Sequence, residues 1–250
     1  MWLRFTNTGH ILISPGDNCR KVIDVMLLTD YNEDFCVTFD LSPDFTAKLM
    51  EAGFLVMSMK LHEPDEKPFY VSIPKLHFDR SALFFENLHI KKSIRRFLKL
   101  YELRPDTEFE QIIDRCVEKH GNDWLTEPLV DTIKQIRASA LNGNPGLSTE
   151  AKNRFPEARA YPTSFALYRD GKLAAGEFGV VCGRVYTSYS GFYDEDNAGA
   201  VQLILTTQYL QEQGFLFFDL GMPMSYKDDL GAVNIEADEF VRLFRLANSF

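Results

Sequence analysis

Apolar residues at helical spacing are clearest in the middle of the chain. Thr107 and Glu110 have the spacing of a capping box, and Gly121 is a stop signal, so a helix is predicted between them. Its predicted buried face consists of Phe109, Ile112, Ile113, Cys116 and Val117. A second helix, capped by Thr126, has an apolar stripe made of Leu129, Ile133, Ile136 and Ala140. Further helices are predicted from Pro43 to Gly53, over Gly199–Gln213 and over Asp238–Leu246.

The pattern then changes to that of strands. Residues 163–190 indicate a meander in which Asp170 and Gly171 form a hairpin turn. The apolar run from Phe215 ends in the carboxylate of Asp219. Near the start of the chain, residues 1–40 suggest short strands joined by turns, with Val22–Leu27 as one apolar run, and Pro74–Glu86 is predicted to be a connector.

This order of elements predicts an α+β fold in which helices flank an antiparallel sheet, as in a GNAT-like acyltransferase domain. We expect a small N-terminal α/β domain over residues 1–86, followed by the GNAT-like domain over 87–250. Residues 142–157 are rich in Gly, Pro, Asn and Ser, and we interpret them as a loop insertion.

Charge modifies this picture in one place. The formal net charge of -9 argues against a protein that coats nucleic acid without specificity. Four cations nevertheless lie within six residues: Lys91, Lys92, Arg95 and Arg96. They predict either a solvated helix face or a patch that contacts phosphates.

Composition excludes several classes of protein. The four cysteines are scattered, with no metal-binding spacing, which is typical of reduced thiols. No run approaches the ~20 apolar residues of a membrane span, and no signal peptide is evident. We therefore expect a cytoplasmic protein with no cofactor, no metal and no membrane partner.

Candidate chemistry gathers in the second half of the chain. Gly179–Ala200 mixes small polar and aromatic residues, as in a pocket that stacks and hydrogen-bonds, although a sheet with a polar edge fits the same composition. Asp219, at the end of a buried strand, is either catalytic or the cap of the next loop. Glu177 is unexpected in an apolar strand; it either faces solvent or acts in the site. Tyr189 is a hydrogen-bond donor or a rim aromatic, and Trp124 is a core residue or a stacking platform.

Several short segments resemble the leucyl/phenylalanyl-tRNA–protein transferases. Ile73–Arg96 is similar to the SPxPRAVLxxExLHISRSxKR segment of that family, and Asp123–Thr126 to its TWI segment. Ala175–Gly199 looks like GGxYGVxxGxxFxGESMFSxxxNAS. Asp219–Gly221 and Leu230–Ala232 resemble DCQ and LGA at the family's spacing.

The resemblance implies aminoacyl transfer, in which the α-amine of an acceptor protein attacks the ester of an aminoacyl-tRNA, and the product is marked for degradation. The partners would be the aminoacyl-tRNA and the acceptor N-terminus. It implies that Asp219, Tyr189 and Glu177 are catalytic and that Lys91, Lys92, Arg95 and Arg96 bind tRNA. The implied substrate-binding residues are Ser188, Ser190, Gly191, Phe192, Asn197, Ser164, Trp124 and Phe178.

The chain also departs from the family pattern. Tyr189 and Gly191 stand in place of the Glu and Met of GESMF, and Gly221 replaces the Gln of DCQ. Thr163–Ala166 replaces HSxE. These differences leave a second hypothesis open, that of a fold relative that binds an RNA end, a peptide or a small ligand in the former aminoacyl pocket. Acyl transfer from coenzyme A is disfavoured because the chain has no RGxGxxG loop, and a serine hydrolase because no His stands in a triad relation to Ser190.

Overall fold

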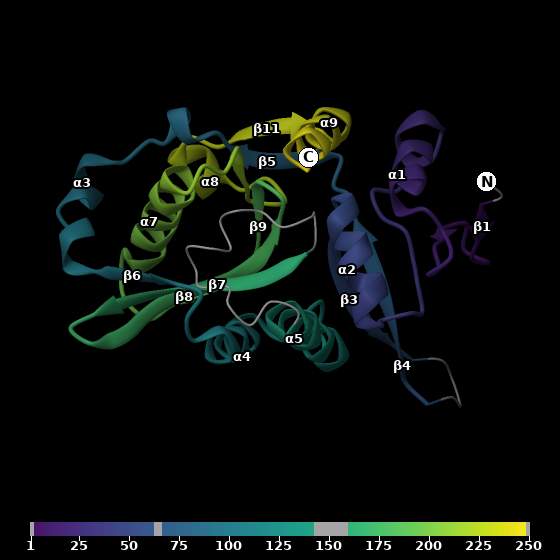
Figure 1. Ribbon diagram of the computed structural model, residues 1–250, viewed down its shortest axis with the longest axis horizontal. Coiled ribbons are helices and arrows are strands. Elements are labelled where there is room, and N and C mark those ends of the chain that lie inside the picture. The colour runs from purple at the N-terminus through teal and green to yellow at the C-terminus, as the bar shows by residue number, and fades with distance from the viewer. Residues whose placement is uncertain (1–2, 63–66, 143–159, 249–250) are drawn as a thin grey trace.

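The protein, seen in a computed structural model that describes residues 3–62, 67–142 and 160–248, is organised around a mixed sheet. The sheet has seven strands in the order β11-β5-β10-β9-β8-β7-β6 (Figure 1). Their bounds are β5 Asp79–Leu83, β6 Glu102–Pro105, β7 Tyr161–Arg169, β8 Lys172–Cys182, β9 Val185–Tyr193, β10 Phe217–Asp219 and β11 Val233–Glu236. A mixed α+β fold with a mostly antiparallel sheet is thereby confirmed.

The predicted meander forms β7, β8 and β9, which pair antiparallel in sequence order. Asp170 and Gly171 turn the chain between β7 and β8 with φ of 50° and 76°, the left-handed conformation that Gly adopts without strain. The chain then crosses the sheet in helix α7, Ala198–Glu212, and returns as β10 parallel to β9.

Helices cover both faces of the sheet. Helix α7 packs on β8, β9 and β10, whereas α4 (Phe109–His120) packs on β7, β8 and β9 and α5 (Glu127–Asn142) on β7 from the other side (Figure 1). The other elements of this half are 3-10 turns at Phe85–Asn87 and Leu98–Leu100 and helices α3 Lys92–Arg95, α8 Ser225–Leu230 and α9 Ala237–Ala247. No helix in the described part of the chain has both the length and the apolar run needed to cross a bilayer.

The N-terminal part adds two helices and two strand pairs. They are β1 Arg4–Phe5 with β2 Ile11–Leu12, α1 Cys19–Leu28, α2 Pro43–Ala52, and β3 Leu55–Leu61 with β4 Phe69–Lys75. Helix α2 ends at Gly53 with φ 110°, as predicted. The prediction of strands alone over residues 1–40 is wrong for Val22–Leu27, which lies in α1. The Asn18 side chain caps this helix, and its buried residues recur at helical spacing.

Two further predictions are corrected. Pro74–Glu86 is not a connector, because it contains β5, which pairs with both β10 and β11 in the main sheet. The capping box at Thr107 is also wrong: its hydroxyl donates to the carbonyl of Arg104, and Glu108 occupies the N-cap of α4. The buried face of α4 is confirmed through Cys116. The predicted insertion lies, beyond Asn142, outside the described residues.

Candidate active site

The site begins at an irregularity in β9. Phe178 of β8 lies opposite Ser190, and the next residue, Gly179, lies opposite Ser188. Tyr189 is therefore an extra residue without a partner in the register, which is a β-bulge. Bulges redirect side chains and are frequent beside functional sites.

The same stretch of β9 borders an open edge of the sheet. Strand β10 pairs with β9 only as far as Asp219, which lies opposite Thr187. Strand β9 continues to Tyr193, and in the described residues no strand pairs with it on that side. Residues 188–191 of this stretch are half-buried.

Asp219 sits at the start of this edge in a fully paired environment. It is completely buried and receives two bonds from Arg80, at 2.8 Å from Nε to Oδ1 and 2.6 Å from the terminal nitrogen to Oδ2. Gly221 N donates to Oδ1 at 3.0 Å and the Thr187 hydroxyl to Oδ2 at 2.8 Å. Burial raises the pKa of Asp219, but Arg80 and these donors outweigh it and lower the pKa below its ordinary value. Such an environment favours a positioning role over a proton-accepting role.

Glu177 has the opposite environment. Its side chain is 4% exposed, and Oε2 accepts one hydrogen bond, from the Ser188 hydroxyl at 3.2 Å. Oε1 is buried with no hydrogen-bond partner in the described chain. Burial raises the pKa of Glu177 to about 8, a shift that the Ser188 bond opposes. A buried carboxyl with one unused oxygen and a pKa near neutrality is suited to proton transfer.

The two carboxyl groups lie on opposite faces of the sheet. Thr187 bonds Asp219 and the next residue, Ser188, bonds Glu177. Consecutive side chains of a strand point to opposite faces. Glu177 therefore shares the face of α7, where the Tyr186 ring lies against Gly179. Asp219 on β10 and Glu177 on β8 thus flank β9.

Other predicted residues surround the bulge. The Tyr189 hydroxyl accepts a hydrogen bond from Val56 N at 3.0 Å, and burial raises its pKa. Its ring lies 6.0 Å from that of Phe178, which is completely buried. Gly191 lies opposite Glu177, and a Cβ there would come within 3.1 Å of the Glu177 Cβ. Glu177, Phe178, Ser188, Tyr189, Ser190 and Gly191 are thus brought together.

The remaining predicted pocket residues lie apart from this group. Phe192 is a core residue, 3% exposed, beneath the Arg115 guanidinium. Trp124 is half-buried, and its carbonyl accepts a bond from Ser58 N of β3. Asn197 is exposed at the N-cap of α7 with φ 69° and makes no side-chain cap bond.

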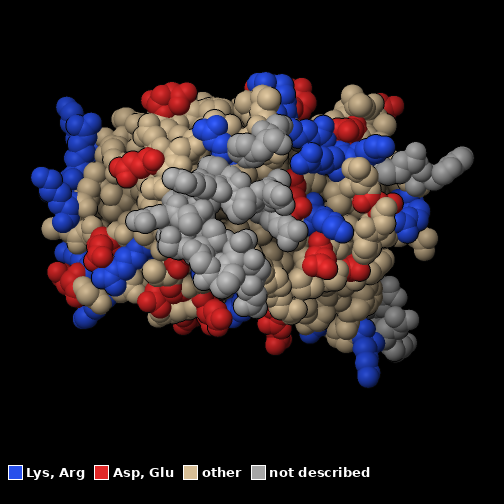
Figure 2. Space-filling view, viewed as in Figure 1, with Lys and Arg blue, Asp and Glu red and all other residues tan. Residues whose placement is uncertain are grey.

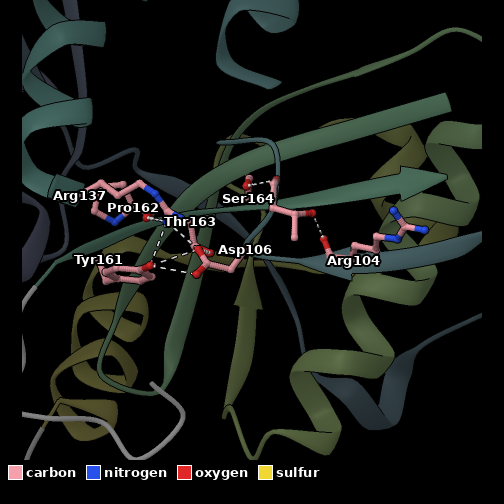
Figure 3. Close-up of polar contacts among 8 residues, drawn as sticks. Arg104, Asp106, Arg137, Tyr161, Pro162, Thr163 and Ser164 are labelled. Atoms are coloured by element: carbon pink, nitrogen blue, oxygen red, sulfur yellow. Dashed lines mark hydrogen bonds and ion pairs between the residues drawn. The ribbon is translucent and has the colours of Figure 1, made fainter. Parts of the chain in front are cut away.

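Ser164 belongs to a polar network at the start of β7 (Figure 3). Its hydroxyl donates to the Thr107 carbonyl at 2.7 Å. Beside it, Arg137, Tyr161 and Thr163 converge on Asp106 in Figure 3. Arg137 and Asp106 are 2.6 Å apart, with side chains 14% and 7% exposed. This network joins α5, β7 and the chain after β6, so it braces one end of the sheet.

The predicted tRNA-binding residues form an exposed cationic surface on α3. Lys91, Lys92, Arg95 and Arg96 are all exposed, and Lys91 pairs with Asp229 at 2.6 Å. Lys and Arg side chains gather along the margin occupied by α3, at the left of Figure 2. We call these four residues the α3 basic surface.

The sequence analysis missed the partners that define the site. Arg80, Thr187 and Lys227 were not identified, although all three are buried. The weak signal for Arg80 was its place among strand-forming residues, which suggests burial. A buried guanidinium requires a carboxylate partner. Lys227 lies between Tyr226 and two aspartates, a sequence typical of an exposed turn, so no pattern indicated its burial. Within the described ranges, no group of three or more His, Cys, Asp or Glu could hold a metal ion.

Comparison with known proteins bears on the same part of the chain. The family model described as leucyl/phenylalanyl-tRNA protein transferase matches residues 146–245, which include β7 to β10 with Glu177, the bulge and Asp219. The chain is similar in sequence to leucyl/phenylalanyl-tRNA–protein transferases. One so named from Pseudomonas entomophila is 26% identical over 64% of this chain and 65% of its own length. Others are from Rubrobacter xylanophilus (27%, over 65% and 76%) and Campylobacter jejuni (23%, over 82% and 85%).

The extent of these matches differs. The match with the Pseudomonas transferase spans less than two thirds of that relative's length. Among solved structures, the C-terminal domain of a putative lysylphosphatidylglycerol synthetase from Agrobacterium fabrum is 14% identical with a TM-score of 0.37, over 96% of this chain and 86% of that one. A similarity this low carries no argument about function, so the sequence relatives alone point to the transferases.

Proposed function

We propose that this protein is an aminoacyl-tRNA–protein transferase. The α-amine of an acceptor protein attacks the ester carbonyl of an aminoacyl-tRNA. The amide bond forms, the ester C–O bond breaks, and the terminal ribose oxygen of the tRNA leaves with a proton. The ester is already activated, so orientation, removal of the amine proton and stabilisation of the oxyanion are sufficient chemistry. The N-terminal extension marks the acceptor for degradation.

The observation that carries this proposal is the family match over residues 146–245, because it includes the bulge, Glu177 and Asp219 together. The end of β9 beyond Thr187, which has no strand partner on the β10 side among the described residues, is consistent with it. The donor side chain is hydrophobic, similar to Leu or Phe, or altered by the replacement that leaves Gly191 at the bulge.

Within this function we assign roles by environment. Glu177 takes the proton from the attacking amine, because its Oε1 has no competing partner among the described residues. Tyr189 contributes its hydroxyl proton, since its oxygen accepts from Val56 N and the proton stays available. Asp219 orients β9 through Thr187 and the following loop through Gly221. Ser188, Ser190, Gly191 and Phe178 shape the aminoacyl pocket, with Ser164, Phe192, Asn197 and Trp124 at its periphery.

The same proposal extends to the fold and the cellular setting. Residues 87–250 form a GNAT-like domain, supported by a meander followed by a helical crossover to a parallel strand. Residues 1–86 form a smaller N-terminal domain that also supplies β5 to the main sheet. We place the protein in the cytoplasm, where charged tRNA and new N-termini are found, without a metal or cofactor.

The α3 basic surface meets the tRNA backbone in this proposal. Each phosphate contact contributes roughly 0.7–0.9 to the slope of log K against log salt. Reversing Lys92, Arg95 and Arg96 to Glu should therefore weaken tRNA binding and flatten its salt dependence. Reversal of the exposed Lys172, in the β7–β8 hairpin, is the matched control. An unchanged slope of log K against log salt would show that the α3 basic surface is a solvated helix face that does not contact tRNA.

The decisive experiment is a transfer assay. The protein is incubated with charged tRNA mixtures and with peptides that differ in their N-terminal residue, and extension is measured by mass spectrometry. Extension by one amino acid residue supports the proposal and identifies the donor. Binding of tRNA or peptide without any extension would favour the alternative, a catalytically altered relative that uses the pocket for binding.

A further inference from the structure

A buried lysine holds the loop that leaves the sheet beside β9. Lys227, on α8, is 6% exposed, yet its ammonium group makes two short bonds to backbone carbonyls. Nζ lies 2.6 Å from the oxygen of Leu220 and 2.6 Å from that of Met222. Two of its three donors are thereby directed at one three-residue segment, the β10 loop, which we define as Leu220–Met222.

The β10 loop is held at its other end by the main sheet. Leu220 N donates to the Ser81 carbonyl, and Ser81 N donates to the Gly221 carbonyl. Gly221 N bonds the Asp219 carboxylate, and Gly221 adopts φ 71°. Every carbonyl of the loop thus has a specific donor, and Lys227 supplies the donors for two of them.

Apolar side chains are exposed at the end of the β10 loop and in the residues that follow it. Met222 is 54% exposed, and Met224 and Tyr226 follow at 42% and 50%. Exposed apolar side chains grouped next to a site commonly contact a ligand, and methionine adapts to differently shaped ligands. Their position depends on the backbone of the loop that Lys227 fixes.

We propose that Lys227 is a positioning residue that fixes the β10 loop and so places Met222 where the aminoacyl end of the donor docks. This inference rests on the proposed transferase function. Lys227 acts through the loop backbone and does not itself touch the reacting atoms. Arginine would not reproduce this arrangement easily, because the two carbonyls converge on one nitrogen atom.

The charges around Lys227 come from four elements. Asp219 lies on β10, Arg80 on β5 and Glu177 on β8, and Asp228 is its neighbour on α8. Burial lowers the pKa of Lys227 to about 8. The charge of Asp219 opposes this decrease, and the charge of Arg80 adds to it. In an opened loop the lysine is solvated, and its pKa returns towards about 10.4. Raising the pH between these values therefore favours the closed loop, which binds the proton less strongly.

The test compares the wild type with Lys227→Met, and with Lys172→Met as a matched exposed control. Hydrogen exchange is measured in the peptide that spans residues 219–226. Loss of two carbonyl partners should speed its exchange by at least about tenfold at pH 7, since both bonds come from a charged donor. The donor KM should rise about tenfold with a smaller change in kcat, and Lys172→Met should change neither.

The pH dependence separates positioning from general stability. After correction for intrinsic exchange, protection of the wild-type loop should increase above pH 8, by up to about tenfold per pH unit, and Lys227→Met should lack this increase. This measurement needs only the wild type if the variant does not fold. Unchanged exchange in a folded Lys227→Met, or wild-type protection that stays constant from pH 8 to 10, overturns the proposal that Lys227 fixes the β10 loop. Faster exchange with an unchanged KM overturns its role in docking. If the wild type shows no transfer, the proposed function fails. The hydrogen-exchange measurements still decide whether Lys227 fixes the β10 loop.

Discussion

Asp219 and Glu177 are buried carboxyl groups on β10 and β8, the two strands that flank β9, and their environments are opposite. Asp219 accepts four hydrogen bonds, two of them from Arg80, and its pKa is lowered. Glu177 accepts one, from Ser188, and its pKa is raised to about 8. Burial acts on both groups in the same direction, so the difference comes from their partners.

The comparison shows why position along a strand is a poor guide to chemical role. Asp219 ends a buried strand, where catalytic groups are common, but all its accepting capacity is used by the fold. Glu177 lies in mid-strand, where a carboxyl group has few donors, and therefore keeps one oxygen free. Asp219 is therefore held by its partners, whereas Glu177 keeps an oxygen that no described group bonds.

The largest effect on stability is expected from Asp219→Ala. It leaves the Arg80 guanidinium buried without its carboxylate, and breaking a buried pair in this way costs about 3–5 kcal/mol. Denaturant unfolding of this variant, with the exposed Asp123→Ala as control, measures the loss. The double variant Arg80→Met with Asp219→Leu should recover much of it, because no charge is then left unpaired. A loss below about 0.5 kcal/mol would show that Asp219 is not the structural partner described here.

Glu177→Gln should reduce transfer by about 10²–10⁴-fold, the usual contribution of a general base. The amide has nearly the same shape and can still accept from Ser188, so the fold is preserved. Transfer rates and unfolding curves are measured on the same preparation. Full activity in this variant would show that Glu177 does not accept the proton, and the proton acceptor would then lie on the face of the sheet that carries Asp219.

The pH dependence of stability sharpens the contrast without any substrate. The pKa of Glu177 is raised on folding, so its favourable contribution is complete below pH 4.5 and is lost as the pH rises through about 8. Relative to the wild type, Glu177→Gln should therefore gain stability across this window, by at most about 5 kcal/mol at ~1.36 kcal/mol per pH unit. Urea unfolding at pH 5, 6, 7 and 8 gives the difference. A constant difference would mean that Glu177 titrates normally.

The sequence was sufficient for the parts of the fold that repeat a local period. The face of α4, the β7–β8 turn and the Gly53 end of α2 follow from spacing and glycine chemistry. It failed for β5 and α1. Strand β5 is short and contains a charged residue, Arg80, so its sequence does not predict a strand in the interior of the sheet. Its position is evident only from its pairing with β10 and β11. The apolar run of α1 suits a strand as well as a helix, and the Asn18 cap was not recognised.

The candidate site was less predictable because its properties depend on partners far apart in the chain. Asp219 and Glu177 were both identified, yet their contrast depends on Arg80 and on the alternation of Thr187 and Ser188. The β-bulge that redirects Tyr189 is a property of strand pairing and not of composition. Lys227 had no sequence signal, because a lysine among polar residues is ordinarily exposed.

The smallest effect is expected from Tyr189→Phe, which tests the Asp219 face of the bulge. The variant removes the acceptor of the buried Val56 amide, and an unsatisfied buried donor costs about 1–3 kcal/mol. Tyr193→Phe, at a residue that is 51% exposed in the same strand, should change stability by less than about 0.5 kcal/mol. Unfolding and transfer are measured for both variants. If Tyr189 only joins β9 to β3, the transfer rate of Tyr189→Phe falls in proportion to its lost stability. If its proton also assists the reaction, the transfer rate falls further than the lost stability and the Tyr193→Phe control explain. Equal stability of the two variants would contradict the bond to Val56.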